Sequence, residues 1–222
     1  MTVCLDGEVA IHVPEWVRDF DTFVTWMHSD EFPEEGRIDF FNNEVWIDIS
    51  MEELYSHNFV KAAVSETLNR LVREDRLGVF VTDGMRFTNE DAGVATTPDG
   101  LFFTFGALTS GRITTRAGQG AVATELRGSP DLIVEVVSPS SVDKDTEWFL
   151  SAYWNAGVSE YWVIDARRAA VGFAVFKRGP KGYTATRRVS GGWVKSAVLG
   201  KSFRLTRTEA APGIPSFVLE VK

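Results

Sequence analysis

The stretch Ser129–Pro139 places a carboxylate inside an apolar run. Residues 132–137 are rich in β-branched side chains and end at a proline-containing turn, which predicts a buried β-strand. Glu135 lies within this strand between valines, and burying an unpaired ionised carboxylate costs several kcal/mol. Because alternate strand residues share a face, Asp131 and Glu135 should point the same way. We therefore expect that face to carry chemistry, an ion pair or the mouth of a cleft.

Two Pro-Asp pairs, Pro98-Asp99 and Pro130-Asp131, each precede a predicted strand. Proline fixes its own backbone and lacks an N–H donor, so each pair can set a carboxylate at a strand mouth. If the two strands are neighbours, Asp99 and Glu135 approach within reach of one ion. Hard cations such as Mg²⁺ prefer carboxylate oxygens, which suits phosphodiester hydrolysis. Asp131 is a poorer co-ligand for Glu135, because four residues along a strand span about 13 Å.

Structural alternatives stand beside this metal site. Pro-Asp is common at strand starts, and Glu135 can instead pair with an arginine. His57 opens a predicted helix and can face the same cleft, but a lone histidine there can also be a cap or a surface residue. The sequence has no phosphate-binding glycine loop, His-Glu-x-x-His pattern or Gly-x-Ser-x-Gly elbow. Seven tryptophans raise a third possibility, a carbohydrate-binding sheet, although Trp16, Trp154 and Trp162 lie in periodic elements and are more simply core.

Composition bounds the class of protein. The chain of 222 residues is 44% apolar and 24% charged, which predicts a globular protein with a real core. No apolar run approaches the roughly 20 residues of a membrane span, and the start does not resemble a signal peptide. Cys4 is the only cysteine, which excludes an intrachain disulfide and a cysteine zinc cluster. We expect a cytoplasmic protein without a membrane partner.

Charge is unevenly distributed along the chain. The net charge is −8, yet residues 166–208 contain 11 Lys/Arg and no acid. Such a segment predicts contact with nucleic acid phosphates, or packing against acidic surface of the same chain or of a second subunit. The candidate nucleic-acid contacts are Arg167, Arg168, Lys177, Arg178, Lys181, Arg187 and Arg188.

Periodicity and turn residues predict an α+β or mixed α/β chain. We expect one domain over residues 1–222, with an N-terminal arm (1–13), a core (14–165) and a basic β extension (166–222). The first helix, residues 14–29, should begin at Pro14 and bury a stripe of Val17, Phe20, Val24 and Met27. The other predicted elements are a hairpin (37–49), a helix (56–75), strands (79–82, 101–105), a hairpin (111–126), a helix (145–156, capped by Asp145 or Thr146), a strand (160–165) and five short C-terminal strands.

Several of these motifs together resemble one family. Pro130–Ser141, Asp145 and the run Tyr153–Asp165 are similar to the bacterial Uma-type family, within the PD-(D/E)XK nuclease superfamily. Further motifs are similar to those of a planctomycete-like subgroup: Asp83-Gly, Pro98-Asp-Gly, Gly111-Arg, Trp193-Val-Lys-Ser-Ala-Val and Ser202-Phe-Arg-Leu. The resemblance implies a restriction-endonuclease-like core, in which a mixed β-sheet is flanked by helices with extra hairpins. It also implies Mg²⁺ or Mn²⁺ as cofactor, DNA as substrate, a homodimer and no organic cofactor.

The resemblance assigns roles to individual residues. Asp99 and Glu135 match the metal-binding carboxylates. The superfamily lysine would fall at Val137, and family members commonly supply it instead at the position of Phe149, so this chain departs twice. Lys144 is the nearest substitute for orienting water or stabilising charge. His57 and Asp131 would support the site or contact substrate, and if no lysine reaches it, a silent nucleic-acid-binding or assembly protein is the alternative.

Overall fold

The computed structural model describes residues 2–5, 9–117 and 123–222. Most strands belong to two six-stranded sheets. The central sheet has the order β14-β13-β12-β11-β8-β5, and the second sheet has the order β4-β3-β7-β6-β10-β9. Strands β1 and β2 pair with each other, and β15, β16 and β17 form a three-stranded sheet. Within the described ranges, no helix combines the length and apolar character needed to cross a membrane.

The strand that carries Glu135 lies inside the central sheet. Strand β11 (Leu132–Val136) runs parallel to β12 (Glu160–Asp165) and antiparallel to β8 (Gly100–Thr104). The condition set for the approach of Asp99 and Glu135, that the two strands opened by Pro-Asp pairs are neighbours, is therefore met. The remaining strands of this sheet are β5 (Gly78–Thr82), β13 (Gly172–Gly179) and β14 (Gly182–Ala185).

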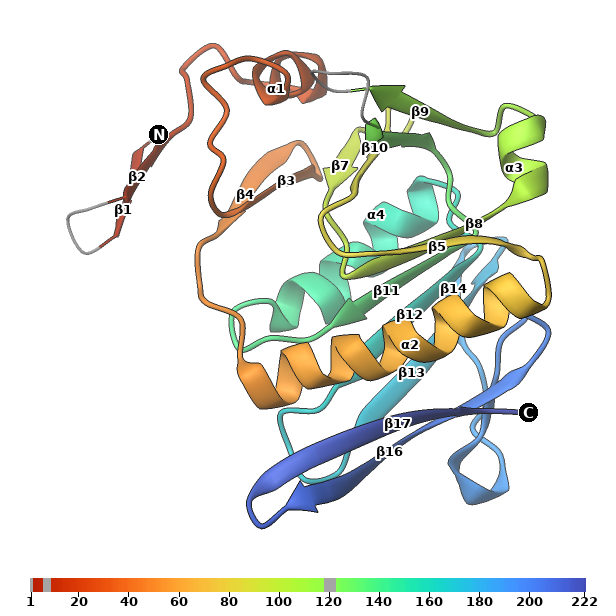
Figure 1. Ribbon diagram of the computed structural model, residues 1–222. Helices are drawn as coiled ribbons and strands as arrows, with labels where there is room; N and C mark the ends of the chain where they lie inside the picture. The colour runs from red at the N-terminus through yellow and green to blue at the C-terminus, as the bar shows by residue number, and fades with distance from the viewer. Residues whose placement is uncertain (1, 6–8, 118–122) are drawn as a thin grey trace.

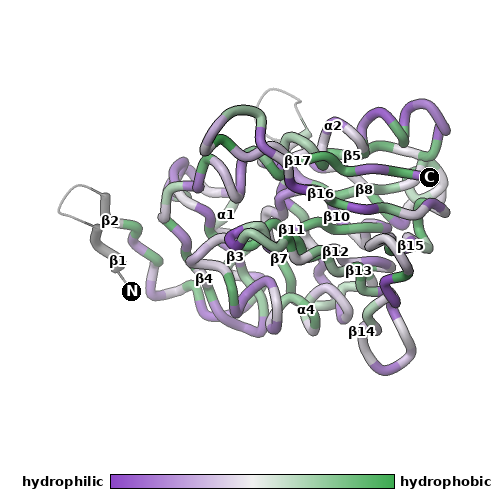
Figure 2. The backbone as a smooth tube through the Cα atoms, turned by 90° about the horizontal axis from the view of Figure 1, so that it is seen from below, coloured by the Kyte–Doolittle hydropathy of each residue, from purple (hydrophilic) through white to green (hydrophobic). Residues whose placement is uncertain are grey.

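Each face of the central sheet is covered by a helix. Helix α2 (Phe59–Glu74) packs on the face that carries Val134 and Trp162, together with β16 (Ser202–Ala211) and β17 (Ile214–Val221). Helix α4 (Phe149–Asn155) packs on the opposite face, which carries Ile133 and Val137 and, by strand alternation, Glu135. In Figure 1, α2 crosses in front of the central sheet, and β16 and β17 run alongside α2. Figure 2 shows β11 and β12 as largely hydrophobic strands in the middle of the molecule.

The second sheet contains the predicted hairpin. Strands β3 (Arg37–Phe41) and β4 (Glu44–Asp48) pair across Asn42 and Asn43, whose φ angles of 52° and 62° fit a tight hairpin turn. The hairpin of 111–126 is also confirmed as a pair, β9 (Ile113–Ala117) with β10 (Ala123–Gly128), and its tip lies outside the described residues. The other elements of this region are β6 (Arg86–Asn89), β7 (Val94–Thr96) and α3 (Phe105–Thr109), and the N-terminal pair is β1 (Thr2–Leu5) with β2 (Val9–His12).

The first helix differs from the prediction. Helix α1 covers only Phe20–Met27, because Asp19 and Thr22 form a capping box that starts the helix there. The predicted start at Pro14 is therefore wrong. The apolar stripe is confirmed but incomplete: Met27 is buried and Val17, Phe20 and Val24 pack against the same cluster, while the most deeply buried side chains of the helix are Phe23 and Trp26.

Helices α2 and α4 are each preceded by a widened turn. A π-helical turn, Leu54–Asn58, precedes α2, and another, Lys144–Trp148, precedes α4. In each, the first residue after the turn donates its N–H to the carbonyl five residues earlier. The predicted helices 56–75 and 145–156 are confirmed, but the cap of the second is wrong: the helical segment begins after Asp143, and Asp145 and Thr146 lie inside its first turn.

The C-terminal strands belong to the hydrophobic core. They include β15 (Val194–Lys195) and a short 3₁₀ turn, Ser190–Gly192. Phe203 of β16 and Leu219 of β17 are buried in the same cluster as α2. Trp162 is buried as expected, whereas Trp16 is exposed because the helix does not extend to it.

Glu160 anchors this C-terminal region to β12. Its fully buried carboxylate accepts hydrogen bonds from Trp162 Nε1 (2.7 Å), Ser196 Oγ (2.6 Å) and the Ala197 N–H (2.7 Å). The change Glu160→Gln sets an amide N–H₂ against one of these donors. We expect it to lower the free energy of unfolding by about 2–4 kcal/mol in urea titrations. Glu66→Gln, at an exposed position of α2, is the matched control, and an equally small effect of both changes would contradict the anchoring role.

Candidate active site

Asp99 is the most heavily contacted carboxylate of the region. It precedes β8 and is buried. Its Oδ1 accepts from Arg37 Nη2 (2.8 Å), and its Oδ2 accepts from the Val136 N–H (2.7 Å) and lies 3.4 Å from His57 Nε2. The Asp99 N–H in turn donates to Glu135 Oε2 (3.3 Å). The structure thus brings together Asp99, Glu135 and His57.

Asp99 and Glu135 have opposite electrostatic settings. Burial, and next the charge of Asp99, raise the pKa of Glu135 well above its usual range. Burial also opposes the ionisation of Asp99, but Arg37 and His57 outweigh it and hold the pKa of Asp99 well below its usual range. Glu135 Oε1 accepts a hydrogen bond from Tyr153 Oη of α4 (2.8 Å). Neighbouring carboxylates with pKa values driven apart are a common arrangement for acid–base work.

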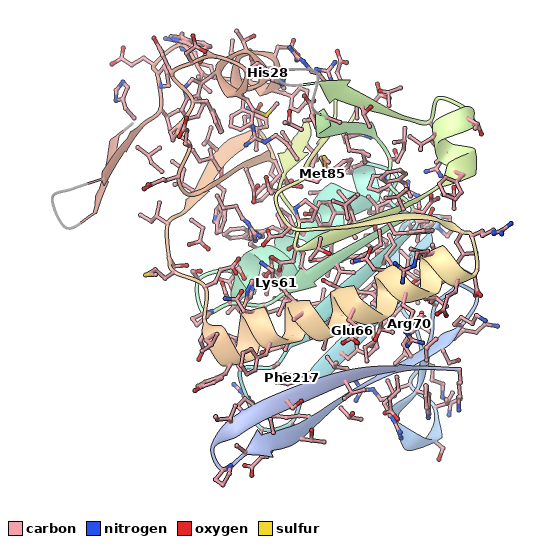
Figure 3. All side chains as sticks on the ribbon, in the orientation of Figure 1. His28, Lys61, Glu66, Arg70, Met85 and Phe217 are labelled. Carbon is pink, nitrogen blue, oxygen red and sulfur yellow. The ribbon has the colours of Figure 1, made fainter. Side chains whose placement is uncertain are left out.

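A second group of side chains lies between Asp99 and solvent. Glu52 Oε2 is 3.5 Å from His57 Nδ1, and Glu52 Oε1 accepts from Lys61 Nζ (2.8 Å). Lys61 Nζ also donates to Asp83 Oδ2 (2.6 Å) and lies 3.6 Å from Asp99 Oδ1. Figure 3 shows Lys61 on the side of α2 that faces the central sheet.

Arg37, Glu52 and Lys61 were not anticipated from the sequence. The spacing of His57 and Lys61, four residues apart, was an available signal, because such residues share one face of a helix. Arg37 and Glu52 carry no such signal. Their contacts with Asp99 and His57 depend on the tertiary fold.

The donor atoms present fit a divalent cation. One ligand atom each from Glu52, His57 and Asp99 lies within 4.8 Å of the others. His57 Nδ1 is buried, makes no hydrogen bond among the described residues and lies 3.5 Å from Glu52 Oε2, so both atoms can serve as ligands of one ion. Carboxylates suit Mg²⁺ and Mn²⁺, and imidazole favours transition metals, which makes Mn²⁺ a good match to the mixed set.

Two adjoining pockets open onto these residues. A pocket of about 280 Å³ is lined by Asp48, Ser50 and His57, and one of about 470 Å³ is lined by Asp83 and Arg86, among others. Both pockets share the residues Gly36, Arg37 and Glu52. The candidate site is therefore reached from solvent past Arg37 and Glu52.

Lys144 points into the protein interior. Its Nζ lies 3.6 Å from Asp39 Oδ2 and 3.5 Å from Asp145 Oδ1, over the rings of Trp46 and Phe149. Burial disfavours the charged amine, but the neighbouring carboxylates outweigh this and raise the pKa of Lys144. Lys144 is thus a buried cation. Its amine lies 4.5 Å from the centre of the Phe149 ring, and Phe149 stands where family members commonly have the lysine.

The charged group formed by Lys144, Asp39 and Asp145 makes the stability of the protein depend on pH. Burial raises the pKa of Asp145 to about 6 from an ordinary value of 3.8. The folded state therefore binds more protons than the unfolded state between pH 4 and 6, and the free energy of unfolding falls as pH rises through this window. We expect Asp145→Asn to gain stability relative to wild type from pH 4 to pH 7, on the order of 2 kcal/mol, in urea titrations. The exposed neighbour Asp143→Asn should follow the wild-type profile, and a parallel profile for Asp145→Asn would contradict the assignment.

Asp131 lies at the opposite end of β11 from the candidate site. Its Oδ1 accepts from Arg112 Nη2 (2.6 Å) and its Oδ2 from the Thr104 N–H (2.8 Å). The second of these contacts joins Asp131 to the end of β8. The structure does not bring Asp131 to Glu135.

The basic C-terminal side chains also fall into separate groups. Lys177 pairs in register with Glu160, at the start of β12. Arg167 and Arg168 follow Asp165, at the end of β12. At the usual rise per strand residue, Glu160 and Asp165 are about 16 Å apart. Three of the seven make structural contacts: Arg167 with the Asp165 carboxylate, Arg178 with the Trp154 carbonyl and Arg188 with the Phe173 carbonyl. The others, Arg168, Lys177, Lys181 and Arg187, are exposed. The seven are therefore spread along the length of β12 and the strands that follow it.

Comparison with known proteins supplies the family. Residues 20–208 match the Uma2 family, which is described as putative restriction endonucleases. The chain belongs to the Uma2 family. The Uma-type resemblance is thereby confirmed, while the planctomycete-like subgroup stays a prediction.

A solved structure supports the Uma2 assignment at the level of the fold. A putative nuclease of the family DUF820 from Anabaena variabilis is similar, with a TM-score of 0.60 and 17% sequence identity over 82% of this chain and 90% of that chain. This similarity confirms a mixed α/β, nuclease-like fold for the Uma2 chain. A search of curated proteins finds no match.

Proposed function

We propose that the protein is a divalent-metal-dependent nuclease that hydrolyses phosphodiester bonds in DNA. The observation that carries the proposal is the buried Asp99–Glu135 pair, placed beside Glu52 and His57 where two pockets meet. The Uma2 family and the nuclease-like fold supply the reaction class. Fold alone does not imply function, so the side chains at the pocket carry the argument.

Four side chains would bind the metal ion. Asp99, Glu52 and His57 would hold the cation, with Glu135 beside them as a further carboxylate ligand. When bound, Mg²⁺ or Mn²⁺ activates water and neutralises charge on the phosphate.

Two lysines would assist in different ways. Lys61, whose amine lies 3.6 Å from Asp99, would orient the attacking water. Lys144 would stabilise the charge of Glu135 from within the core, since the charge of Glu135 in turn raises the pKa of Lys144.

A catalytically silent member of the same fold is the second candidate. Val137 and Phe149, which stand at the usual lysine positions, are fully buried in one hydrophobic cluster. Lys144 is enclosed rather than open to the pockets. Such a protein would bind nucleic acid or assemble with a partner without cleaving it.

Further features belong to the proposal. The exposed side chains of Arg168, Lys177, Lys181 and Arg187 support contact with DNA phosphates. A homodimer would pair two sites for two strand cuts, and a cytoplasmic location would give access to DNA.

The test is cleavage of plasmid and single-stranded DNA at low salt, with Mg²⁺ or Mn²⁺ and with EDTA. Wild type should cleave only with metal, Asp99→Asn should be inactive, and Glu66→Gln should match wild type. Absence of wild-type cleavage, with Mn²⁺ binding and folding intact, would favour the silent candidate. Cleavage that persists in EDTA would overturn the metal-dependent mechanism.

A further inference from the structure

Arg37 occupies a special place in the candidate site. It is the first residue of β3, and its backbone is held in register with Asp48 of β4. The preceding Gly36 has a φ of +86°, and a Cβ at that position would lie 3.2 Å from the Ile11 side chain. Glycine there lets the backbone approach Ile11 closely just before Arg37. The base of the Arg37 side chain is therefore fixed, while its end lies at both pockets.

The guanidinium of Arg37 has unused donors. An arginine carries five N–H donors, but within the described part of the chain this one makes a single hydrogen bond, to Asp99 Oδ1. The planar fork of a guanidinium matches two oxygens of a phosphate. Its remaining donors are thus available to a ligand in the pockets.

Arg37 and a metal ion would both bind the Asp99 carboxylate. Asp99 is one of the three residues that could hold a cation, and its Oδ2 already accepts from the Val136 N–H. Oδ1 is the oxygen that Arg37 occupies. Two cations on one carboxylate oxygen repel each other, so a divalent ion and the guanidinium compete there.

Among the cations around Asp99, Arg37 is the one with room to move. Its side chain is 20% exposed, against 8% for Lys61 and 3% for His57. Lys61 is also held by two other carboxylates. An arriving ion can displace Arg37 into the pockets without disturbing the core.

We propose that Arg37 exchanges partners during binding: it holds the Asp99 carboxylate until a divalent cation displaces it, and then binds the substrate phosphate with its freed fork. This rests on the proposed nuclease function and names the residue that recognises the phosphate. It makes Arg37 a substrate-binding residue that weakens metal binding in the absence of substrate.

The experiment measures Mn²⁺ affinity by isothermal titration calorimetry and by electron paramagnetic resonance of free Mn²⁺. Wild type is compared with Arg37→Gln, and with Arg112→Gln as a control that removes the same charge from an ion-paired arginine at the far end of β11. Arg37→Gln should bind Mn²⁺ roughly tenfold more tightly, since a competitor is removed. Arg112→Gln should bind as wild type does. Thermal unfolding checks that all three are folded.

The second measurement is oligonucleotide cleavage at saturating Mn²⁺. Arg37→Gln should raise KM by roughly tenfold or more, because the phosphate loses its arginine. Unchanged or weaker Mn²⁺ binding by Arg37→Gln would overturn the competition with metal, and an unchanged KM would overturn the phosphate contact. If neither wild type nor Arg37→Gln binds Mn²⁺, the metal site of the proposed function fails, and the exchange fails with it.

Discussion

Replacing Glu135 by glutamine is expected to reduce metal-dependent cleavage by about a thousandfold while leaving the protein folded. Glu135 adds a second carboxylate beside Asp99, and the amide cannot supply its charge. The amide oxygen can accept the Asp99 N–H while the amide N–H₂ donates to Tyr153 Oη, so no donor is set against another and the packing of α4 is retained. The initial rate of plasmid cleavage in Mn²⁺, with thermal unfolding of the same samples, measures both parts of the prediction.

The unfolding temperature of Glu135→Gln distinguishes a catalytic role of Glu135 from a purely structural one. Burial and the charge of Asp99 disfavour the ionised form of Glu135, so replacing Glu135 by a neutral glutamine should leave the unfolding temperature unchanged or raise it. Tyr153→Phe is the companion variant, since it removes the hydroxyl that donates to Glu135 and that also contacts Thr96 Oγ1 at 3.2 Å. We expect it to cleave more slowly than wild type and faster than Glu135→Gln. Cleavage by Glu135→Gln within tenfold of wild type would remove Glu135 from the proposed machinery.

The change Lys144→Met should lower the free energy of unfolding by about 3–5 kcal/mol, the typical cost of removing one partner from a buried ion pair. Methionine fills a similar volume between the Trp46 and Phe149 rings. The loss therefore comes from the uncompensated carboxylates of Asp39 and Asp145, rather than from a cavity. Urea unfolding at pH 7 measures the effect.

Two further variants test this explanation. Lys195→Met, at an exposed position of β15, controls for the loss of charge and should lie within about 0.5 kcal/mol of wild type. The double change Lys144→Met with Asp145→Asn should be more stable than Lys144→Met alone, because one unpaired carboxylate is removed. If the double variant is less stable than the single one, packing rather than charge explains the role of Lys144.

The central part of the fold was predictable because its signals are local. The strand around Glu135 has a continuous β-branched run between turn residues, and the Asn42-Asn43 pair marks a hairpin. The closeness of Asp99 and Glu135 followed from a single assumption, that their strands are neighbours.

The remainder of the candidate site could not be predicted because it depends on distant pairings. Arg37 and Asp99 are 62 residues apart, and the position of Arg37 depends on β3, a strand of the second sheet. Lys144 was singled out by its position after the Glu135 strand, but sequence alone did not show that the rings of Trp46 and Phe149 would enclose it. The first helix was misplaced because hydrophobic period outweighed the capping signal of Asp19 and Thr22.

The π-helical turns before α2 and α4 have an evolutionary consequence. Each holds one residue more than a regular helical turn, and these turns carry His57 and Lys144. Because an α-helix turns by about 100° per residue, deleting one residue from either turn would rotate the residues before the deletion relative to the helix that follows. The side chain of His57 or Lys144 would then point in another direction, while the buried stripe of α2 or α4 stays in place. Under the proposed function, a single-codon deletion would therefore be a short route from a nuclease to an inert protein with the same core.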